Sequence, residues 1–276
     1  MTDRIKMIGF DLDGTLLTSN KEITDYTREV LVRAIDQGVV VLPATGRPFQ
    51  GVPKELLEFP GIRYALTANG ARVVDLKENK VLRETLMPVW TAREILTIFE
   101  KYDTMREIYY DGVGYAEERM FERIGDFLDK APMANYILTT RVPVKNVREK
   151  FEAENRSVDK MQAIFADVSD KDRALLDLQA VGDIEVTGAL TNNIEINAKG
   201  VNKGRALVEL GAMLGIRREE IMAFGDGDND IYMMREAGFG VAMANGVDEV
   251  RAAADYITVS NDEDGVAKVI EKYVLR

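Results

Sequence analysis

Acidic residues follow short apolar runs at two distant places in this sequence. Asp11 and Asp13 come directly after Ile5–Phe10, and the acidic segment 226–230 comes shortly after Ile221–Phe224. Carboxylates gathered at one site can bind a hard divalent cation, donate and accept protons, or attack phosphorus. The chemistry of this protein therefore depends on whether the two acidic segments meet in the folded chain.

Other polar residues also follow apolar runs. Thr45 and Gly46 follow Val39–Pro43, and Asn69 follows a further expected strand, Tyr64–Thr67. Lys203 lies just ahead of a helix striped with leucines. In an open parallel sheet, ligands bind at the carboxyl ends of the strands. If these runs are neighbouring strands, we expect all of the groups that follow them to converge on one crevice.

Four carboxylates in one crevice, those of Asp11, Asp13, Asp226 and Asp230, need a counter-charge. Oxygen-only ligation suits a hard cation, so Mg²⁺ is the predicted metal. Three ionised carboxylates carry three negative charges, which Mg²⁺ and the Lys203 ammonium would balance. An EF-hand calcium loop is the alternative for the late acidic segment.

That alternative fails at two positions of the segment. An EF-hand loop requires glycine at its sixth position and glutamate at its twelfth, where this chain has Ile231 and Ala237.

A phosphate entering the crevice still needs hydrogen-bond donors. We expect them from backbone N–H groups near Leu12, Gly14 and Gly46, the Thr45 hydroxyl and the Asn229 amide. Each of these residues alone has a simpler role in a turn or a helix cap, and only their shared placement favours phosphate binding.

The chain contains no cysteine and no histidine. Disulfides, thiolate chemistry, His-ligated zinc and Ser-His-Asp hydrolysis are therefore excluded. A carboxylate is then the predicted nucleophile for phosphoryl transfer. One aspartate would attack phosphorus in line, and a second, protonated one would donate to the leaving oxygen and then take a proton from water. We expect this for Asp11 and Asp13, with their pKa values pushed apart.

The composition describes an ordinary globular protein. The 276 residues are 46% hydrophobic and 30% charged, and the net charge is −11. The sequence pI near 4.8 disfavours nucleic-acid binding. The sequence offers no apolar run of the roughly 20 residues that a membrane span needs, so we expect a soluble, cytoplasmic protein.

Hydrophobic periodicity predicts the elements that carry these residues. The strand Ile5–Phe10, the helix Thr24–Gln37 and the strand Val39–Pro43 form a βαβ unit, which favours a parallel sheet. The C-terminal third shows the same pattern of short apolar strands and amphipathic helices. Its expected elements are the strands Ile221–Phe224, Gly240-Val241 and Tyr256–Thr258 and the amphipathic helix Val266–Val274.

The pattern of expected strands and helices changes between about Glu84 and Gly188. Expected helices alternate there with short strands that end without an acidic, glycine-containing loop. The helices are Thr91–Tyr102, Glu117–Lys130, Val144–Glu154 and Asp170–Ala180, and the strands are Ile108–Tyr110, Tyr115 and Met161–Phe165. We predict a second domain, 84–187, inserted into a core formed by 1–83 and 188–276.

Four motifs in this order resemble the haloacid dehalogenase-like hydrolase superfamily. They are DLDGTL (11–16), ATGR (44–47), NKG (202–204) and GDGDND (225–230). The roughly 100-residue insert is similar to the α/β cap of the Cof-type subfamily, as are TANGA (67–71), GVAMAN (240–245) and DGVA (264–267). The C-terminal third looks closest to the YidA-like sugar phosphatases. The resemblance implies a doubly wound, mostly parallel α/β core with an inserted α/β cap that selects the substrate.

The resemblance also implies a role for each matching residue. Asp11 would be the nucleophile and a metal ligand, Asp13 the general acid and base with its carbonyl on Mg²⁺, Asp226 the third ligand and Asp230 its support. The phosphate would be held by Leu12, Thr45, Gly46, Lys203 and Asn229. Arg47 and Asn69 would face the cap and the substrate.

The implied activity is Mg²⁺-dependent hydrolysis of a small phosphomonoester, with a sugar phosphate as the expected substrate. Asp13 argues against a dehalogenase, which does not protonate an alkoxide. A phosphosugar mutase would use the same residues and stays open, and a non-catalytic phospho-acceptor resembling a receiver domain is a further alternative. The expected partner is a small phosphorylated metabolite, not a nucleic acid or a membrane. The sequence leaves the oligomeric state open.

Overall fold

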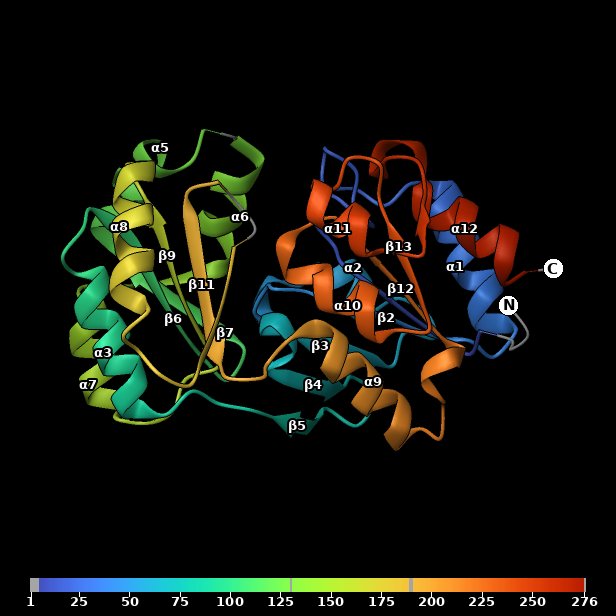
Figure 1. Cartoon of the computed structure of the whole chain (residues 1–276), viewed down its shortest axis with the longest axis horizontal. Helices are drawn as coiled ribbons and strands as arrows, with labels where there is room; N and C mark the ends of the chain where they lie inside the picture. The colour runs from blue at the N-terminus through green and yellow to red at the C-terminus, as the bar shows by residue number, and fades with distance from the viewer. Residues whose placement is uncertain (1–4, 130, 189–190, 276) are drawn as a thin grey trace. The chain divides into compact units, whose positions relative to one another are not determined.

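A computed structural model describes residues 5–129, 131–188 and 191–275 of the chain. The chain divides into two compact units (Figure 1). The described parts of Met1–Gly46, Pro53–Arg83 and Asn202–Arg276 form the first unit, and those of Arg47–Val52 and Glu84–Val201 form the second. Among the described residues, none of the helices combines the length and the apolar character that a membrane span requires.

The first unit is built on a five-stranded sheet in which all strands are parallel. Its strands, in spatial order, are β14 (Tyr256–Ile257), β13 (Phe239–Ala242), β12 (Ile221–Gly225), β1 (Met7–Phe10) and β2 (Val40–Pro43). All four residues of β1 are buried and none carries a charge. A continuous apolar run of this kind is typical of a strand covered on both faces.

Helices lie on both faces of this sheet, as a doubly wound fold requires. Figure 1 shows α1 (Asp25–Asp36) and α12 (Gly265–Tyr273) beside one face, and α9 (Lys203–Met213), α10 (Ile231–Glu236) and α11 (Asp248–Ala253) beside the other. The short helix α2 (Lys54–Leu57) also belongs to this unit. The predicted parallel α/β core is confirmed.

The expected strand Tyr64–Thr67 forms, but in another sheet. As β3 (Tyr64–Thr67) it pairs antiparallel with β4 (Arg72–Asp75), and β5 (Lys80–Glu84) completes a three-stranded sheet. A single parallel bridge between Ala44 and Leu66 connects β3 with the end of β2. This bridge keeps the end of β3 beside the parallel sheet.

The second unit contains a six-stranded sheet that is mostly antiparallel. Its strands, in spatial order, are β10 (Ile184–Thr187), β11 (Asn193–Ala198), β9 (Lys160–Phe165), β6 (Thr104–Tyr110), β7 (Val113–Glu117) and β8 (Arg141–Val144). Its helices are α3 (Val89–Phe99), α4 (Glu118–Glu122), α5 (Ile124–Phe127), α6 (Ala131–Thr140), α7 (Val147–Glu154) and α8 (Val168–Leu178).

Three features of this unit differ from the prediction. The expected helix Glu117–Lys130 is divided into α4 and α5, and α6 was not predicted at all. The apolar stretch of α6 is short: Ile137 is buried, and Met133 and Tyr136 pack against the same cluster. A stretch this short does not by itself predict a helix. The unit extends to Val201 and not to residue 187, because β11 pairs with both β9 and β10.

One glycine of the first unit is required by a close approach of two helices. Gly204, in the first turn of α9, lies against the backbone of α10, where an added Cβ would overlap the carbonyl group of Tyr232. We expect Gly204→Ala to lower the free energy of unfolding by about 2 kcal/mol, because backbone cannot move aside cheaply. Chemical denaturation measures this loss.

Gly125→Ala is the matched control, because a Cβ at Gly125 would meet nothing within 4 Å. Equal stability of the Gly204 variant and the wild-type protein would show that the two helices can separate without cost.

Candidate active site

The strand ends that carry the predicted residues lie on one edge of the parallel sheet. Phe10, the last residue of β1, is in register with Pro43 of β2 and Phe224 of β12. The backbone N–H of Asp11 donates to the carbonyl of Phe224 over 3.0 Å. The segments that begin at Asp11 and Thr45 and the acidic segment 226–230 therefore leave the sheet side by side.

Lys203 lies at the centre of this edge. Its ammonium is 2.6 Å from Asp11 Oδ1 and 2.7 Å from Asp230 Oδ1, and its side chain is fully buried. Asn202 precedes it as the N-cap of α9 and accepts a hydrogen bond from the backbone N–H of Arg205 over 2.7 Å. The cap fixes the first turn of α9, and with it the direction in which Lys203 extends.

Three carboxylates among the described residues lie close enough to share one metal ion. Oxygen atoms of Asp11, Asp226 and Asp230 all lie within 4.8 Å of one another. With Lys203 the group carries a formal charge of −2 when all three carboxylates are ionised. Oxygen donors with excess negative charge suit a hard divalent cation, so these residues could hold a metal ion.

The three carboxylates are not equivalent. Asp230 Oδ2 accepts hydrogen bonds from the backbone N–H groups of Asp226 and Gly227 over 2.9 and 3.0 Å. These bonds hold the loop in which Asp226 lies. The Thr15 hydroxyl donates to Asp226 Oδ1 over 2.5 Å, and Gly14 has φ +82° where a Cβ would overlap the Asp226 carboxylate. The first acidic segment therefore packs directly on the second.

Burial and neighbouring charges shift the pKa values of the ionisable groups in this cluster. Burial raises the pKa of the Asp11 carboxyl, Lys203 opposes that rise, and the charges of Asp230 and Asp13 add to it. Burial likewise raises the pKa of Asp226, with Asp11 and Asp230 adding to the rise. Burial lowers the pKa of Lys203, but the charges of Asp11 and Asp230 outweigh it and hold that pKa above its ordinary value.

Two predicted phosphate ligands, Asn229 and Thr45, are linked across three loops through Asn69, which was predicted to face the substrate. Asn229 donates from Nδ2 to Asn69 Oδ1 over 3.1 Å. The backbone N–H of Asn69 donates to the carbonyl of Thr45 over 3.0 Å, and that of Thr45 donates to the carbonyl of Leu66 over 2.9 Å. Asn69 adopts a left-handed conformation with φ 59°. The loops after β2, β3 and β12 are therefore tied together.

Several predicted residues lie outside the cluster of three carboxylates. Asp13 forms an ion pair with Lys21 over 2.6 Å, a residue to which sequence reasoning gave no role. Arg47 belongs to the second unit, where its guanidinium donates to the carbonyl of Gly51 and lies 4.1 Å above the ring of Tyr136. Leu12 is fully buried in the loop after β1, and its carbonyl accepts from the backbone N–H of Leu17.

The second unit buries a row of polar side chains on one face of its sheet. Strand register places Gln162 of β9 between Glu107 of β6 and Glu195 of β11. Arg141 pairs with Glu107 over 2.7 Å, and Lys160 pairs with Glu195 over 3.0 Å. Glu107 Oε1 is buried without a hydrogen-bond partner. Sequence reasoning placed the strand Ile108–Tyr110 in this region but missed these charged residues, because no motif marks them.

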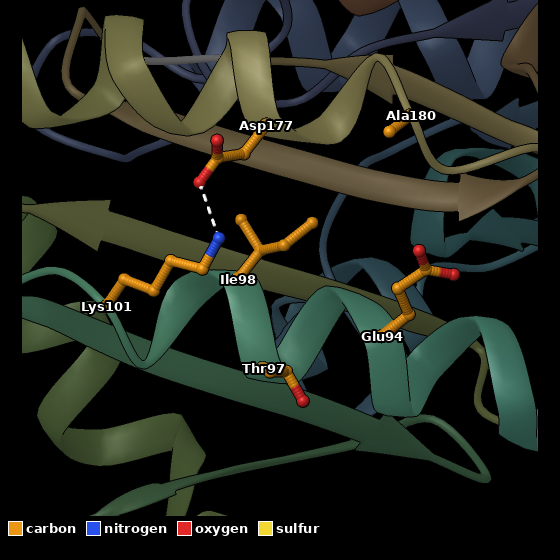
Figure 2. Close-up of a pocket in the computed structure, with 6 residues that line it drawn as sticks. All are labelled: Glu94, Thr97, Ile98, Lys101, Asp177 and Ala180. Atoms are coloured by element: carbon orange, nitrogen blue, oxygen red, sulfur yellow. Dashed lines mark hydrogen bonds and ion pairs between the residues drawn. The ribbon is translucent and has the colours of Figure 1, made fainter.

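A hollow on the second unit holds none of the predicted residues. Figure 2 shows it between α3 and α8, lined by Glu94, Thr97, Ile98, Lys101, Asp177 and Ala180. Lys101 Nζ lies 2.9 Å from Asp177 Oδ2, so these two charges balance each other. We assign no chemistry to this hollow.

Comparisons with known proteins agree with the geometry. A family model described as haloacid dehalogenase-like hydrolase matches residues 8–270. The chain is 34% identical over 280 residues to the 5-amino-6-(5-phospho-D-ribitylamino)uracil phosphatase YcsE of Bacillus subtilis, covering 98% of this chain and 96% of that protein. This relative is a phosphatase whose substrate is a small phosphorylated metabolite.

Solved structures with the same fold extend the comparison. The chain resembles the structure of the subclass IIB sugar phosphatase BT4131 with a TM-score of 0.82, 28% identity and coverage of 97% and 98% of the two chains. It resembles a haloacid dehalogenase-like hydrolase from B. subtilis with a TM-score of 0.86, 26% identity and coverage of 97% and 99%.

The raised pKa values of Asp11 and Asp226 predict how a divalent cation affects stability. The unfolded chain releases these protons near the ordinary value of 3.8, whereas the metal-free folded protein keeps them to higher pH. The contribution of these two groups to the free energy of unfolding therefore falls as the pH rises above that value. Mg²⁺ binds the ionised form, so we expect it to raise Tm more at about pH 8 than at about pH 6.

Thermal denaturation with and without Mg²⁺ at the two pH values measures this difference. Asp226→Asn is expected to lose most of the Mg²⁺-dependent rise, whereas Asp228→Asn, which changes an exposed carboxylate of the same segment, should keep it. A rise in Tm that is the same at both pH values would contradict the linkage.

Proposed function

We propose that this chain, which belongs to the Cof-type haloacid dehalogenase-like hydrolases, is a Mg²⁺-dependent phosphatase that acts through an aspartyl-phosphate on Asp11. At the coarser level, it is a phosphatase of small phosphorylated metabolites. The observation that carries the finer proposal is the approach of Asp11, Asp226 and Asp230 around the buried Lys203.

The residues present fit the proposed metal ion. Asp11 and Asp226 would bind it, while Asp230 would hold the loop through its two backbone hydrogen bonds. Mg²⁺ is a hard cation that accepts oxygen ligands of this kind. When bound, it would offset the charge of the carboxylates and of the entering phosphate, so that two anions can approach each other.

Asp11 is the proposed nucleophile because its carboxylate lies at the end of β1 within this cluster. Its oxygen would form a bond to phosphorus as the bond from phosphorus to the leaving oxygen breaks. Asp13, in its protonated form, would give its proton to that leaving oxygen, and would then take a proton from the water that hydrolyses the aspartyl-phosphate. Lys203, Thr45, Gly46, Asn229 and the Leu12 amide would hold the phosphate oxygens.

The proposed substrate class is a phosphorylated sugar or polyol. YcsE acts on a compound with a phosphorylated ribityl chain, and BT4131 is a sugar phosphatase. The polar row of the second unit supports the same class, because buried charged side chains suit hydroxyl groups better than an aliphatic chain. We propose that the second unit selects the substrate, with Asn69 and Arg47 as further contacts, and that the protein acts in the cytoplasm.

Asp11→Asn tests the nucleophile. We expect turnover of phosphomonoesters to fall to background, because an amide does not form the aspartyl-phosphate. Steady release of inorganic phosphate with Mg²⁺ is the measurement, and repeated turnover by the wild-type protein separates a phosphatase from a phospho-acceptor or a mutase. Asp228→Asn is the control with the same charge change. Full activity of the Asp11 variant would overturn the proposal.

A panel of phosphorylated metabolites tests the substrate class. We expect sugar and polyol phosphates to have the highest kcat/KM, because their hydroxyl groups can bond to buried polar groups. Glu107→Gln is expected to reduce kcat/KM for the best of them by about tenfold and to leave p-nitrophenyl phosphate nearly unaffected. A preference for aliphatic monophosphates would contradict this assignment.

A further inference from the structure

Asp13 is held from a loop that has no part in the proposed chemistry. Lys21 Nζ lies 2.6 Å from Asp13 Oδ1, and each of the two side chains is 27% exposed. Lys21 occupies a tight turn with φ 66°, in which its backbone N–H donates to the carbonyl of Thr18 over 2.8 Å. The turn carries the lysine back toward the aspartate eight residues earlier.

The turn is itself anchored by the C-terminal part of the first unit. Ser19 donates from its backbone N–H and from its hydroxyl to the two carboxylate oxygens of Asp262, each over 2.7 Å. Asn261 donates from Nδ2 to the carbonyl of Leu17 over 2.8 Å. Contacts on both sides of residue 18 therefore fix the turn to one segment more than 240 residues away.

The two ends of the loop 14–24 are held in the same way. Asn245 donates from Nδ2 to the carbonyl of Gly14 over 2.8 Å, and the hydroxyls of Thr24 and Thr27 donate to Asp264 Oδ1. The motifs that contain Asn245 and Asp264 were noted in the sequence without a role. In the structure they hold the loop that presents Lys21.

A partly exposed ion pair contributes little to stability, so stability alone does not account for this arrangement. The ion pair instead affects the orientation of the Asp13 carboxyl group. When one oxygen of a carboxyl group is bonded to a fixed cation, the rotation of the group is restricted and its second oxygen points in one direction. A general acid works only when its proton lies within hydrogen-bond distance of the leaving oxygen.

On this basis we propose that Lys21 is a positioning residue that orients the Asp13 carboxyl group toward the leaving oxygen. This inference rests on the proposed function, in which Asp13 gives its proton to that oxygen as the bond to phosphorus breaks. Asn245, Asn261, Asp262 and Asp264 act one step further away, because they hold the loop from which Lys21 extends.

The inference predicts an effect that depends on the leaving group. An alkoxide needs a proton as it leaves, whereas p-nitrophenolate is stable without one. Lys21→Met should therefore lower kcat/KM for an alkyl or sugar phosphate by about tenfold, part of the 10²–10⁴ that acid–base catalysis supplies. For p-nitrophenyl phosphate the loss should stay below about twofold.

The experiment compares kcat/KM for the two kinds of substrate in the wild-type protein and four variants, with Tm measured for each. Lys21→Arg should recover most of the loss, because it restores a cation. Lys54→Met is the control, since it removes a lysine from another ion pair of the first unit, that with Glu58. Asp262→Ala should reproduce the leaving-group-dependent loss from a distance, because it releases the turn that holds Lys21.

Equal losses for both substrates, or no loss for either, would overturn the positioning role. Recovery by Lys21→Arg together with a selective loss in Asp262→Ala would support it, since a general loss of stability produces neither. Failure of the proposed function has a different signature: an active Asp11→Asn variant. A result in which Asp11→Asn is inactive and Lys21→Met is fully active rejects this inference alone.

Discussion

A buried lysine between two aspartates is the interaction on which the active site depends. Lys203 is removed from water together with Asp11 and Asp230, and burying each of these ions without a partner would cost several kcal/mol. The three groups can therefore be buried only together. This requirement fixes the start of α9 against the end of β1 and the loop after β12, which are the three places that the chemistry needs.

The same interaction explains why the site is poised to bind further charge. Burial raises the pKa of Asp11 and of Asp226, the neighbouring carboxylates add to that rise, and Lys203 offsets only part of it. A divalent cation would offset the negative charge of the three carboxylates, whereas a proton would do so only by blocking the proposed nucleophile. In the proposed mechanism, a bound cation would let the Asp11 carboxylate approach a phosphate.

Loops supply the reactive groups, and residues distant in the chain hold these loops. Asn229, Asn69 and Thr45 support one another across three strand ends, and the loop 14–24 is held by the segment that contains Asn261 and Asp262. Precise positions on loops need a supporting set of contacts. Here that support comes from the chain's last quarter, so the first and last parts of the chain form one catalytic unit although an insert separates them.

The sequence by itself determined the parallel α/β core, because the buried apolar runs and the polar residues at their ends can be read without a structure. It also determined that Asp11, Thr45 and Asp226 follow such runs, and parallel strands bring their ends to one edge. In the insert it was less informative: α6 has only a short apolar stretch, and β11 joins the second unit through pairings that no local pattern encodes.

Only the tertiary structure decided which side chains touch. The pairing of Lys203 with Asp230 as well as Asp11, the pairing of Lys21 with Asp13, and the polar row that contains Glu107 are contacts between residues whose types are common on any surface. Local sequence specifies backbone conformation and burial, but a contact across many residues depends on where the whole fold places two loops or strands. The residues that the proposed chemistry uses could therefore be named from the sequence, and their partners could not.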